Sequence, residues 1–168
     1  GSLRGVERTL TVGVLGCGNV GAALVALIGE RGDEIAARTG VRLRVGAVAV
    51  RSLSKEREVD LDPSVLTTDA HAVVTDPDVD LVVEVIGGIE PARELIATAL
   101  EQGKPVVTAN KELLANVGAE LFAAADAAGV DLLFEAAVAG GIPIIRPMRE
   151  SLVAEDVSRV TGIINGTT

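Results

Sequence analysis

Three glycines near the start of the chain have the spacing of a phosphate-binding turn. They form the pattern G-x-G-x-x-G between an apolar run and a stretch with helical spacing, which is the context that a dinucleotide-binding motif requires. The first glycine allows the tight turn, the second lets the backbone approach a pyrophosphate, and the third lets the helix lie close to the strand. The helix start offers free N–H groups and a positive dipole end to the phosphates. The motif residues that we expect at the cofactor are Gly16, Gly18, Asn19, Val20 and Gly21.

A lysine further along the chain lies where its charge is disfavoured. In the segment 104–116 a strand is expected to end at Thr108, and Lys111 falls in the first turn of the next helix, which Asn110 can cap. The helix dipole opposes a cation there, and sequences often break such a rule at functional sites. Ligands of parallel sheets also bind at the carboxyl ends of strands. Lys111 is therefore a candidate for ligand contact; the alternative is a surface lysine neutralised by Glu112.

A cluster of cations follows the second expected strand and bears on which dinucleotide is bound. NAD-selective folds place an acidic residue at the end of that strand, about 20 residues past the glycines, whereas here Val50 is followed by Arg51. Lys55 and Arg57 lie in the same loop, and arginine can grip a phosphate bidentately. We therefore predict NADP(H), with Arg51 and Lys55 at its 2′-phosphate, and NAD(H) as the alternative. A solvated loop balanced by neighbouring glutamates is the other interpretation.

Apolar and helical stretches alternate along the chain and must position these residues. The expected strands cover residues 10–15, 43–50, 80–86, 105–107, 130–134 and 157–164. The expected helices cover residues 19–30, 69–74, 91–102, a segment beginning near 111, 119–128 and 142–152. The first helix is either interrupted at 31–32 or extended over 33–38, and residues 51–65 are expected to be a loop. This alternation predicts an α/β fold of Rossmann type, doubly wound around a mainly parallel sheet.

The expected elements also suggest how the chain divides into domains. We interpret residues 1–9 as a tag remnant with an N-terminal extension, and residues 10–155 as an NAD(P)-binding domain. Residues 156–168 are interpreted as the start of a truncated domain for substrate binding and dimerisation, because a second domain of this kind has no room in the chain. Within the main domain, Glu84 interrupts an apolar strand. It is either buried and hydrogen-bonded near the cofactor or faces an edge.

The composition excludes several classes of partner. The chain has 168 residues, of which 48% are hydrophobic, and its formal net charge is −9. Such a charge disfavours nucleic acid, which needs a basic face, and the absence of Trp and Tyr removes stacking platforms for single strands. No apolar run approaches the roughly 20 residues that span a bilayer, and no signal peptide is visible. The single Cys17 cannot form an internal disulfide, which favours a cytoplasmic setting.

Five stretches of the sequence, in this order, are together specific for one enzyme family. From about residue 10 to the end, the chain resembles homoserine dehydrogenase. That resemblance implies hydride transfer between L-homoserine and L-aspartate 4-semialdehyde with NAD(P), on the route to threonine, methionine and isoleucine. The stretches are Gly-Cys-Gly-Asn-Val-Gly (16–21), Glu-Val-Ile-Gly-Gly (84–88), Val-Thr-Ala-Asn-Lys (107–111), Phe-Glu-Ala-Ala-Val-Ala-Gly-Gly-Ile-Pro (134–143) and Ile-Asn-Gly-Thr-Thr (164–168).

The resemblance also implies roles for individual residues. Lys111 resembles the family's lysine that contacts the substrate and assists proton transfer at its hydroxyl or carbonyl, where an ammonium would stabilise a developing alkoxide. Thr108 resembles a residue that lines the nicotinamide, and Gly87 is assigned to the cofactor with it. Gly166 and Thr167 resemble substrate-binding residues. The family's monovalent-cation loop, which holds sodium through a carboxylate and backbone carbonyls, corresponds to Glu135, Val138, Gly140 and Ile142. A plain strand-to-helix turn is the alternative there.

Further lysine and acidic side chains of the family fall beyond the final Asn-Gly-Thr-Thr. We therefore expect this chain to be inactive alone, and we expect the full-length protein to be a homodimer, with the oligomeric state of the fragment open. Two other functions remain as alternatives. A non-catalytic dinucleotide-sensing domain would bind cofactor without homoserine chemistry, and a related dehydrogenase would act on aspartate or its semialdehyde.

Overall fold

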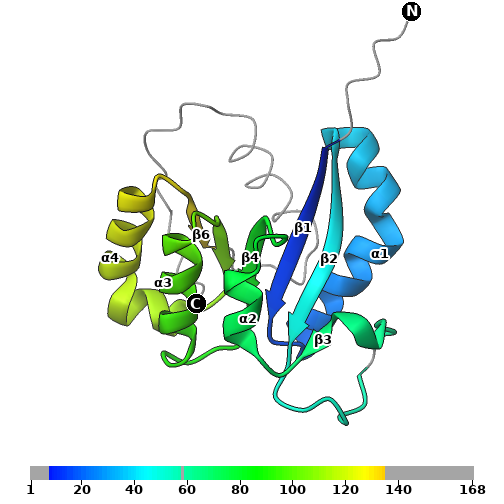
Figure 1. Ribbon diagram of the computed structural model, residues 1–168, viewed down its shortest axis with the longest axis horizontal. Coiled ribbons are helices and arrows are strands. Elements are labelled where there is room, and N and C mark those ends of the chain that lie inside the picture. The colour runs from blue at the N-terminus through cyan, green and yellow to red at the C-terminus, as the bar shows by residue number, and fades with distance from the viewer. Residues whose placement is uncertain (1–7, 58, 135–168) are drawn as a thin grey trace, which may run out of the picture.

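A six-stranded, all-parallel sheet forms the centre of the molecule, with strand order β3-β2-β1-β4-β5-β6. The computed structural model describes residues 8–57 and 59–134. The strands are β1 (Arg8–Leu15), β2 (Val41–Ala49), β3 (Leu66–Thr67), β4 (Leu81–Glu84), β5 (Val106–Thr108) and β6 (Leu132–Phe134). The helices are α1 (Asn19–Thr39), α2 (Ala70–Thr75), α3 (Ala92–Glu101) and α4 (Lys111–Ala128), with a 3₁₀ turn, η1, at Pro63–Val65. This arrangement confirms the predicted Rossmann-type α/β fold (Figure 1).

Helices cover both faces of the sheet, because alternate strand residues are apolar on either side. Val82 of β4 and Val106 of β5 belong to the cluster that includes side chains of α2, α3 and α4. Their neighbours Val83 and Val107 belong to a second cluster that includes side chains of α1. Figure 1 shows α1 on one side of the sheet and the other three helices on the opposite side. Burial on both faces explains why β4 reads as a nearly continuous apolar run.

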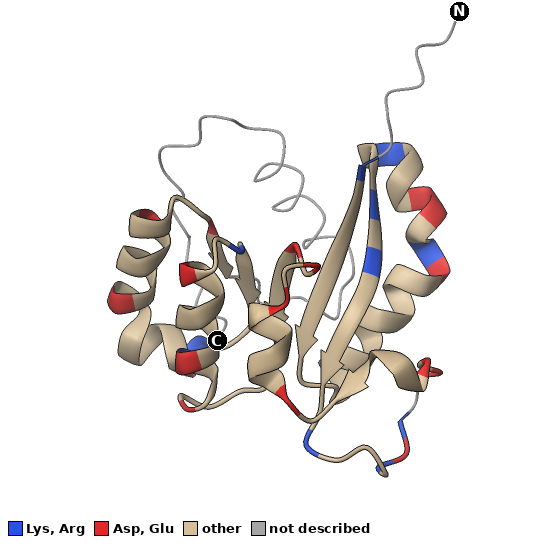
Figure 2. Cartoon of the chain, viewed as in Figure 1, with Lys and Arg blue, Asp and Glu red and all other residues tan. Residues whose placement is uncertain are grey.

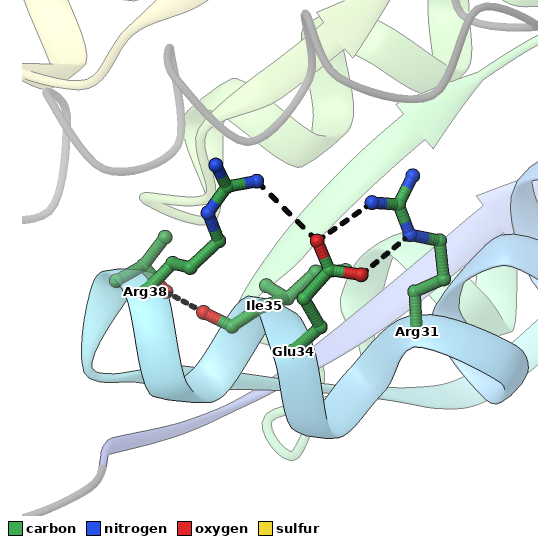
Figure 3. Close-up of polar contacts among 5 residues, drawn as sticks. Arg31, Glu34, Ile35 and Arg38 are labelled. Carbon is green, nitrogen blue, oxygen red and sulfur yellow. Dashed lines mark hydrogen bonds and ion pairs between the residues drawn. The ribbon is translucent and has the colours of Figure 1, made fainter.

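Helix α1 is a single helix of 21 residues, so the predicted extension over 33–38 is confirmed and the interruption is wrong. It ends at Gly40, whose φ of 74° lies in the left-handed region that glycine tolerates. Its exposed face carries Glu34 between Arg31 and Arg38 (Figure 3). The hydrogen bond from Arg31 holds the pKa of the Glu34 carboxyl below its usual range. Pairs of this kind, one helical turn apart, support a long helix.

The other element boundaries depart from the predictions in ways that have local causes. The predicted loop 51–65 contains the turn η1, and the short edge strand β3 that follows was not predicted. The two segments expected near 111 and over 119–128 are one helix, α4, which bends at Val117, where φ is −132°. Helix α3 begins after Pro91 rather than at it. No described helix combines the length and apolar character that a bilayer crossing needs. The predicted helix 142–152 and strand 157–164 lie outside the described residues.

Candidate functional site

The three motif glycines form the turn that joins β1 to α1. Gly16 has a φ of 97°, and a Cβ there would lie 3.1 Å from the carbonyl oxygen of Val85. A Cβ on Gly21 would collide with the carbonyl oxygen of Gly16, so the first turn of α1 can lie against the loop only without a side chain at this position. Gly18 is exposed, and a Cβ there would meet no protein atom within 4 Å. Gly18 thus faces open space, as a phosphate-contacting glycine must.

The start of α1 presents unpaired backbone donors beside this turn. The first helical hydrogen bond runs from the Ala22 N–H to the Gly18 carbonyl oxygen, at 2.9 Å. The N–H groups of Asn19, Val20 and Gly21 therefore have no intrahelical acceptor. No acidic side chain stands in the first turn to occupy them. Bare N–H groups at the positive end of a 21-residue helix fit the pyrophosphate of a dinucleotide.

The loop after β2 carries exposed cations at the same edge of the sheet as the glycine turn. Figure 2 colours the positions of basic residues blue, and several lie along this loop at the bottom of the view. Arg51 and Lys55 are exposed, and no acidic residue stands at the end of β2. Arg57 is half-buried and donates hydrogen bonds to the backbone carbonyl oxygens of Lys55, at 2.8 Å, and Ser52. Arg57 therefore shapes the loop from within, while the other two cations remain available to a ligand.

Cys17 lies in the middle of the glycine-rich turn and is half-buried. Burial raises the pKa of its thiol above the usual range, and the adjacent Arg57 guanidinium offsets part of this rise. The guanidinium thus links the loop after β2 to the glycine-rich turn. Its Nε atom is buried and has no hydrogen-bond partner within the described segments.

The carboxyl ends of the three central strands form one row. Leu15 of β1 is the register partner of Glu84 in β4, which in turn is the register partner of Thr108 in β5. The chain order reverses between β1 and β4, and this is the switch point at which such sheets bind their ligands. The predicted glycine turn, Thr108 and Lys111 are therefore brought to one edge of the sheet.

Glu84 is completely buried at this edge, which decides between the two predicted environments in favour of burial. Its Oε1 atom accepts hydrogen bonds from the N–H groups of Ile86, at 2.9 Å, and Gly87, at 3.2 Å. Its Oε2 atom accepts a hydrogen bond of 2.5 Å from the Thr108 hydroxyl. Within the described segments no cation pairs with Glu84. Hydrogen bonds alone compensate the burial of this carboxylate.

Asn110 caps α4, as predicted, and fixes the position of Lys111. Its Oδ1 atom accepts a hydrogen bond of 3.0 Å from the Leu113 N–H, and its Nδ2 atom donates one of 2.5 Å to the Gly88 carbonyl oxygen. Lys111 is the first residue of the helix and is exposed. Its side chain therefore leaves the protein at the same edge of the sheet as the ends of β4 and β5. Sequence reasoning treated Asn110 only as a helix cap and missed its second bond, which joins two turns that are distant in sequence.

The remaining predicted residues fall outside the part of the chain that the structure describes. They are the substrate residues Gly166 and Thr167 and the sodium loop residues Glu135, Val138, Gly140 and Ile142. Over residues 8–57 and 59–134, no group of three or more His, Cys, Asp or Glu side chains is arranged to hold a metal ion. The structure therefore does not test the sodium prediction.

Comparison with known proteins identifies relatives of the whole chain. Residues 16–135 match the family model described as "Homoserine dehydrogenase, NAD binding domain". Over 165 residues the chain is 51% identical to homoserine dehydrogenase of Corynebacterium glutamicum, and over 161 residues it is 46% identical to that of Bacillus subtilis. These alignments cover 98% and 96% of the chain but only 37% of each relative. The chain thus spans little more than a third of the length of these relatives.

Solved structures of such enzymes share the fold. A crystal structure of a homoserine dehydrogenase from Thiobacillus denitrificans superimposes with a TM-score of 0.72 at 51% identity, over 86% of the chain and 33% of that structure. The enzyme from S. aureus gives a TM-score of 0.73 at 37% identity, over 77% of the chain and 33% of that structure. A hyperthermophilic archaeal homoserine dehydrogenase solved in complex with NADPH gives 0.61 at 25% identity, over 76% and 44%.

Proposed function

Since the chain belongs to the homoserine dehydrogenase family, of which it carries the NAD-binding domain, we propose that it binds the cofactor for the interconversion of L-homoserine and L-aspartate 4-semialdehyde. The observation that carries this proposal is the glycine turn: Gly18 faces open space beside the unpaired N–H groups of α1. When bound, the nicotinamide supplies or accepts the hydride. The protein supplies binding and orientation. The setting that we propose is cytoplasmic, and the full-length assembly that we propose is a homodimer.

We further propose that the chain prefers NADP(H) to NAD(H). Arg51 and Lys55 are exposed in the loop after β2, where NAD-selective folds carry an acid. The backbone of that loop is held by Arg57, which leaves the other two side chains free to meet a 2′-phosphate. The archaeal relative that was solved with NADPH supports the same choice.

Lys111 is the residue that we propose for contact with the substrate. It begins α4 at the carboxyl edge of the sheet, and the cap at Asn110 sets the direction in which the helix leaves β5. An ammonium at this point can polarise the aldehyde oxygen of the semialdehyde and stabilise the alkoxide that forms. Thr108 and Gly87, at the neighbouring strand ends, are proposed to line the nicotinamide. Gly166 and Thr167 are proposed for substrate binding, and the loop at Glu135, Val138, Gly140 and Ile142 is proposed for sodium.

Calorimetric titration with NADPH and with NADH tests the proposed cofactor. We expect the chain to bind NADPH more tightly than NADH. We expect Arg51→Ala to weaken NADPH binding by roughly ten- to a hundredfold while NADH binding stays constant, because a hydrogen-bonded charge contact is worth about 1.5–3 kcal/mol. Arg38→Ala makes the same change of charge near the far end of α1 and should alter neither affinity. Equal affinity of the unaltered chain for both dinucleotides would contradict the NADP(H) proposal.

A second variant separates cofactor binding from folding. A Cβ at Gly18 would meet no protein atom within 4 Å, so the Gly18→Val chain should fold, with only the small loss of stability expected when valine replaces glycine at a helix N-cap. The substitution should nevertheless abolish the binding of both dinucleotides, because the branched side chain fills the space that the pyrophosphate needs. Retained binding in a folded Gly18→Val variant would overturn the proposed position of the pyrophosphate.

A further inference from the structure

Glu84 closes a ring of hydrogen bonds between two turns at the carboxyl edge of the sheet. One turn follows β4, where the carboxylate accepts from the N–H groups of Ile86 and Gly87. The other follows β5, where the same carboxylate accepts from the Thr108 hydroxyl. The ring is completed by Asn110, whose side chain donates to the Gly88 carbonyl oxygen. All its members belong to the segments 84–88 and 108–110.

The Thr108 hydroxyl is the one member of this ring that both donates and accepts. The Thr108 hydroxyl donates its single proton to the Oε2 atom of Glu84. The hydroxyl oxygen then accepts from the Asn110 N–H, at 3.1 Å. Thr108 and Glu84 are both completely buried. Neither side chain can therefore exchange this hydrogen bond for one with bulk water. The Thr108 hydroxyl thus donates to Glu84 and accepts from Asn110, and we call this direction of donation the proton order of the ring.

The ring holds parts of the chain that the cofactor must meet. Gly87 and Gly88 have φ values of 83° and 72°, and such a turn keeps its shape only if its surroundings fix it. Thr108 and the cap residue Asn110 set the start of α4. In a fold of this plan the adenosine half of a dinucleotide lies over β1 and β2. The strands β4 and β5, across the switch point, lie under the nicotinamide half.

We propose that Glu84 is a positioning residue for the nicotinamide half of the cofactor. Its buried carboxyl group acts through Gly87 and Thr108, which donate hydrogen bonds to it. This inference rests on the proposed cofactor binding. It assigns a function to a buried carboxyl group that pairs with no cation within residues 8–57 and 59–134, whereas a core residue that only fills space would be apolar.

The isosteric variant Glu84→Gln tests the proton order directly. An amide oxygen can still accept from the N–H groups of Ile86 and Gly87, but the amide nitrogen then faces Thr108 as a donor. The Thr108 hydroxyl would lose its acceptor and turn its proton away, while the volume of the side chain stays nearly the same. Both turns should shift or loosen without loss of the fold.

The experiment is calorimetric titration with NADPH and with ADP-ribose 2′-phosphate, which lacks only the nicotinamide. We expect Glu84→Gln to weaken NADPH binding about tenfold, equivalent to roughly 1.4 kcal/mol, and to leave the binding of ADP-ribose 2′-phosphate unchanged. Glu101→Gln, an exposed carboxylate at the end of α3, is the matched control and should alter neither affinity. An equal loss for both ligands would indicate general destabilisation and overturn the inference.

Two threonine variants test the same hydrogen bond from the other side, and they do so even if Glu84→Gln fails to fold. Thr108→Val removes the hydroxyl and should weaken NADPH binding selectively, as Glu84→Gln does, whereas Thr108→Ser keeps the hydroxyl and should restore it. The double variant Glu84→Gln/Thr108→Val should be no weaker than either single variant, since both act through one bond. Additive losses, or a Ser variant as weak as the Val variant, would overturn the inference. If the unaltered chain binds neither ligand, the proposed function itself fails.

Discussion

At the level of single residues, Cys17 shows how a conspicuous side chain can be chemically quiet. It occupies the glycine-rich turn, where a low-pKa thiol would be exposed to solutes at the start of a helix. Burial instead raises the pKa of this thiol, and the Arg57 guanidinium reverses only part of the rise. The thiolate is the reactive form of cysteine. At neutral pH, therefore, Cys17 should persist as an unreactive thiol.

Alkylation with iodoacetamide as a function of pH measures this effect. We expect Cys17 to react more slowly than free cysteine at pH 8 and to gain reactivity only at higher pH, because its raised pKa keeps it protonated. In Arg57→Met the onset should move to still higher pH, since the favourable charge is lost while an apolar stem remains. Bound NADPH should protect the thiol. A reaction at pH 7 as fast as that of free cysteine would contradict the predicted direction.

At the level of elements, close approach between α2 and the sheet depends on a strand glycine. A Cβ on Gly13, in β1, would lie 2.7 Å from Cγ1 of Val73 and 3.0 Å from Cγ1 of Val79. Both neighbours are buried and β-branched, so neither can turn away easily. By contrast, Gly29 in α1 is exposed, and a Cβ there would meet nothing within 4 Å. The same substitution should therefore have opposite effects at the two positions.

Urea unfolding followed by circular dichroism compares these glycines. Gly13→Ala should lower the free energy of unfolding by roughly 1–3 kcal/mol, the usual cost of overpacking. Gly29→Ala should raise it by about 0.5–1 kcal/mol, because alanine is the better helix former. Equal midpoints for the two variants would show that α2 can move away from β1 at little cost.

The sequence patterns predicted the long elements well and the short or irregular ones poorly. The apolar runs of β1 and β4 and the helical spacing of α1 are strong signals, and the structure has each element where the sequence predicts it, with α1 in its extended form. The strand β3 has two residues and pairs only with Val48 and Ala49, so it carries no periodic pattern. The sequence pattern predicts two helical stretches where the structure has one helix, α4, that bends at Val117.

The candidate site was predictable where the local sequence contains the reason for a residue. The glycine turn is such a case, because strand, glycines and helix follow one another. The partnership of Glu84 with Thr108 depends on the register between two strands, which the sequence does not display. For that reason the sequence left two environments open for Glu84, a buried one and one at an edge. The link from Arg57 to the glycine turn likewise joins segments that are distant in sequence.

At the level of the whole molecule, the candidate site lies between two halves of one sheet that carry different functional groups. The half formed by β1, β2 and β3 carries the glycine turn and the exposed cations, whereas the other half carries the ring of Glu84 and the start of α4. A dinucleotide that straddles the switch point meets both halves. The chain spans 37% of the length of its relatives from C. glutamicum and B. subtilis. Cofactor binding and catalytic turnover are therefore two separate predictions for this chain.

We expect the isolated chain to bind cofactor but not to oxidise homoserine. Lys111 provides one contact, whereas correct orientation of the substrate can contribute roughly 7–11 kcal/mol to lowering the barrier. Absorbance of NADPH formed from NADP and L-homoserine is the measurement, with a full-length homoserine dehydrogenase as the positive control. A rate that increases in proportion to the concentration of the purified chain would contradict this expectation.

The brevity of β3 has a consequence for how the molecule behaves at high concentration. Because β3 pairs only with the last two residues of β2, residues 41–47 have no described strand partner on the side away from β1. An open strand edge invites pairing with another copy and, from there, aggregation. Here that edge carries Arg42 and Arg44, whose guanidinium groups bind Asp33 and Thr11. Charged, solvated side chains on an apolar strand act as gatekeepers against such self-association.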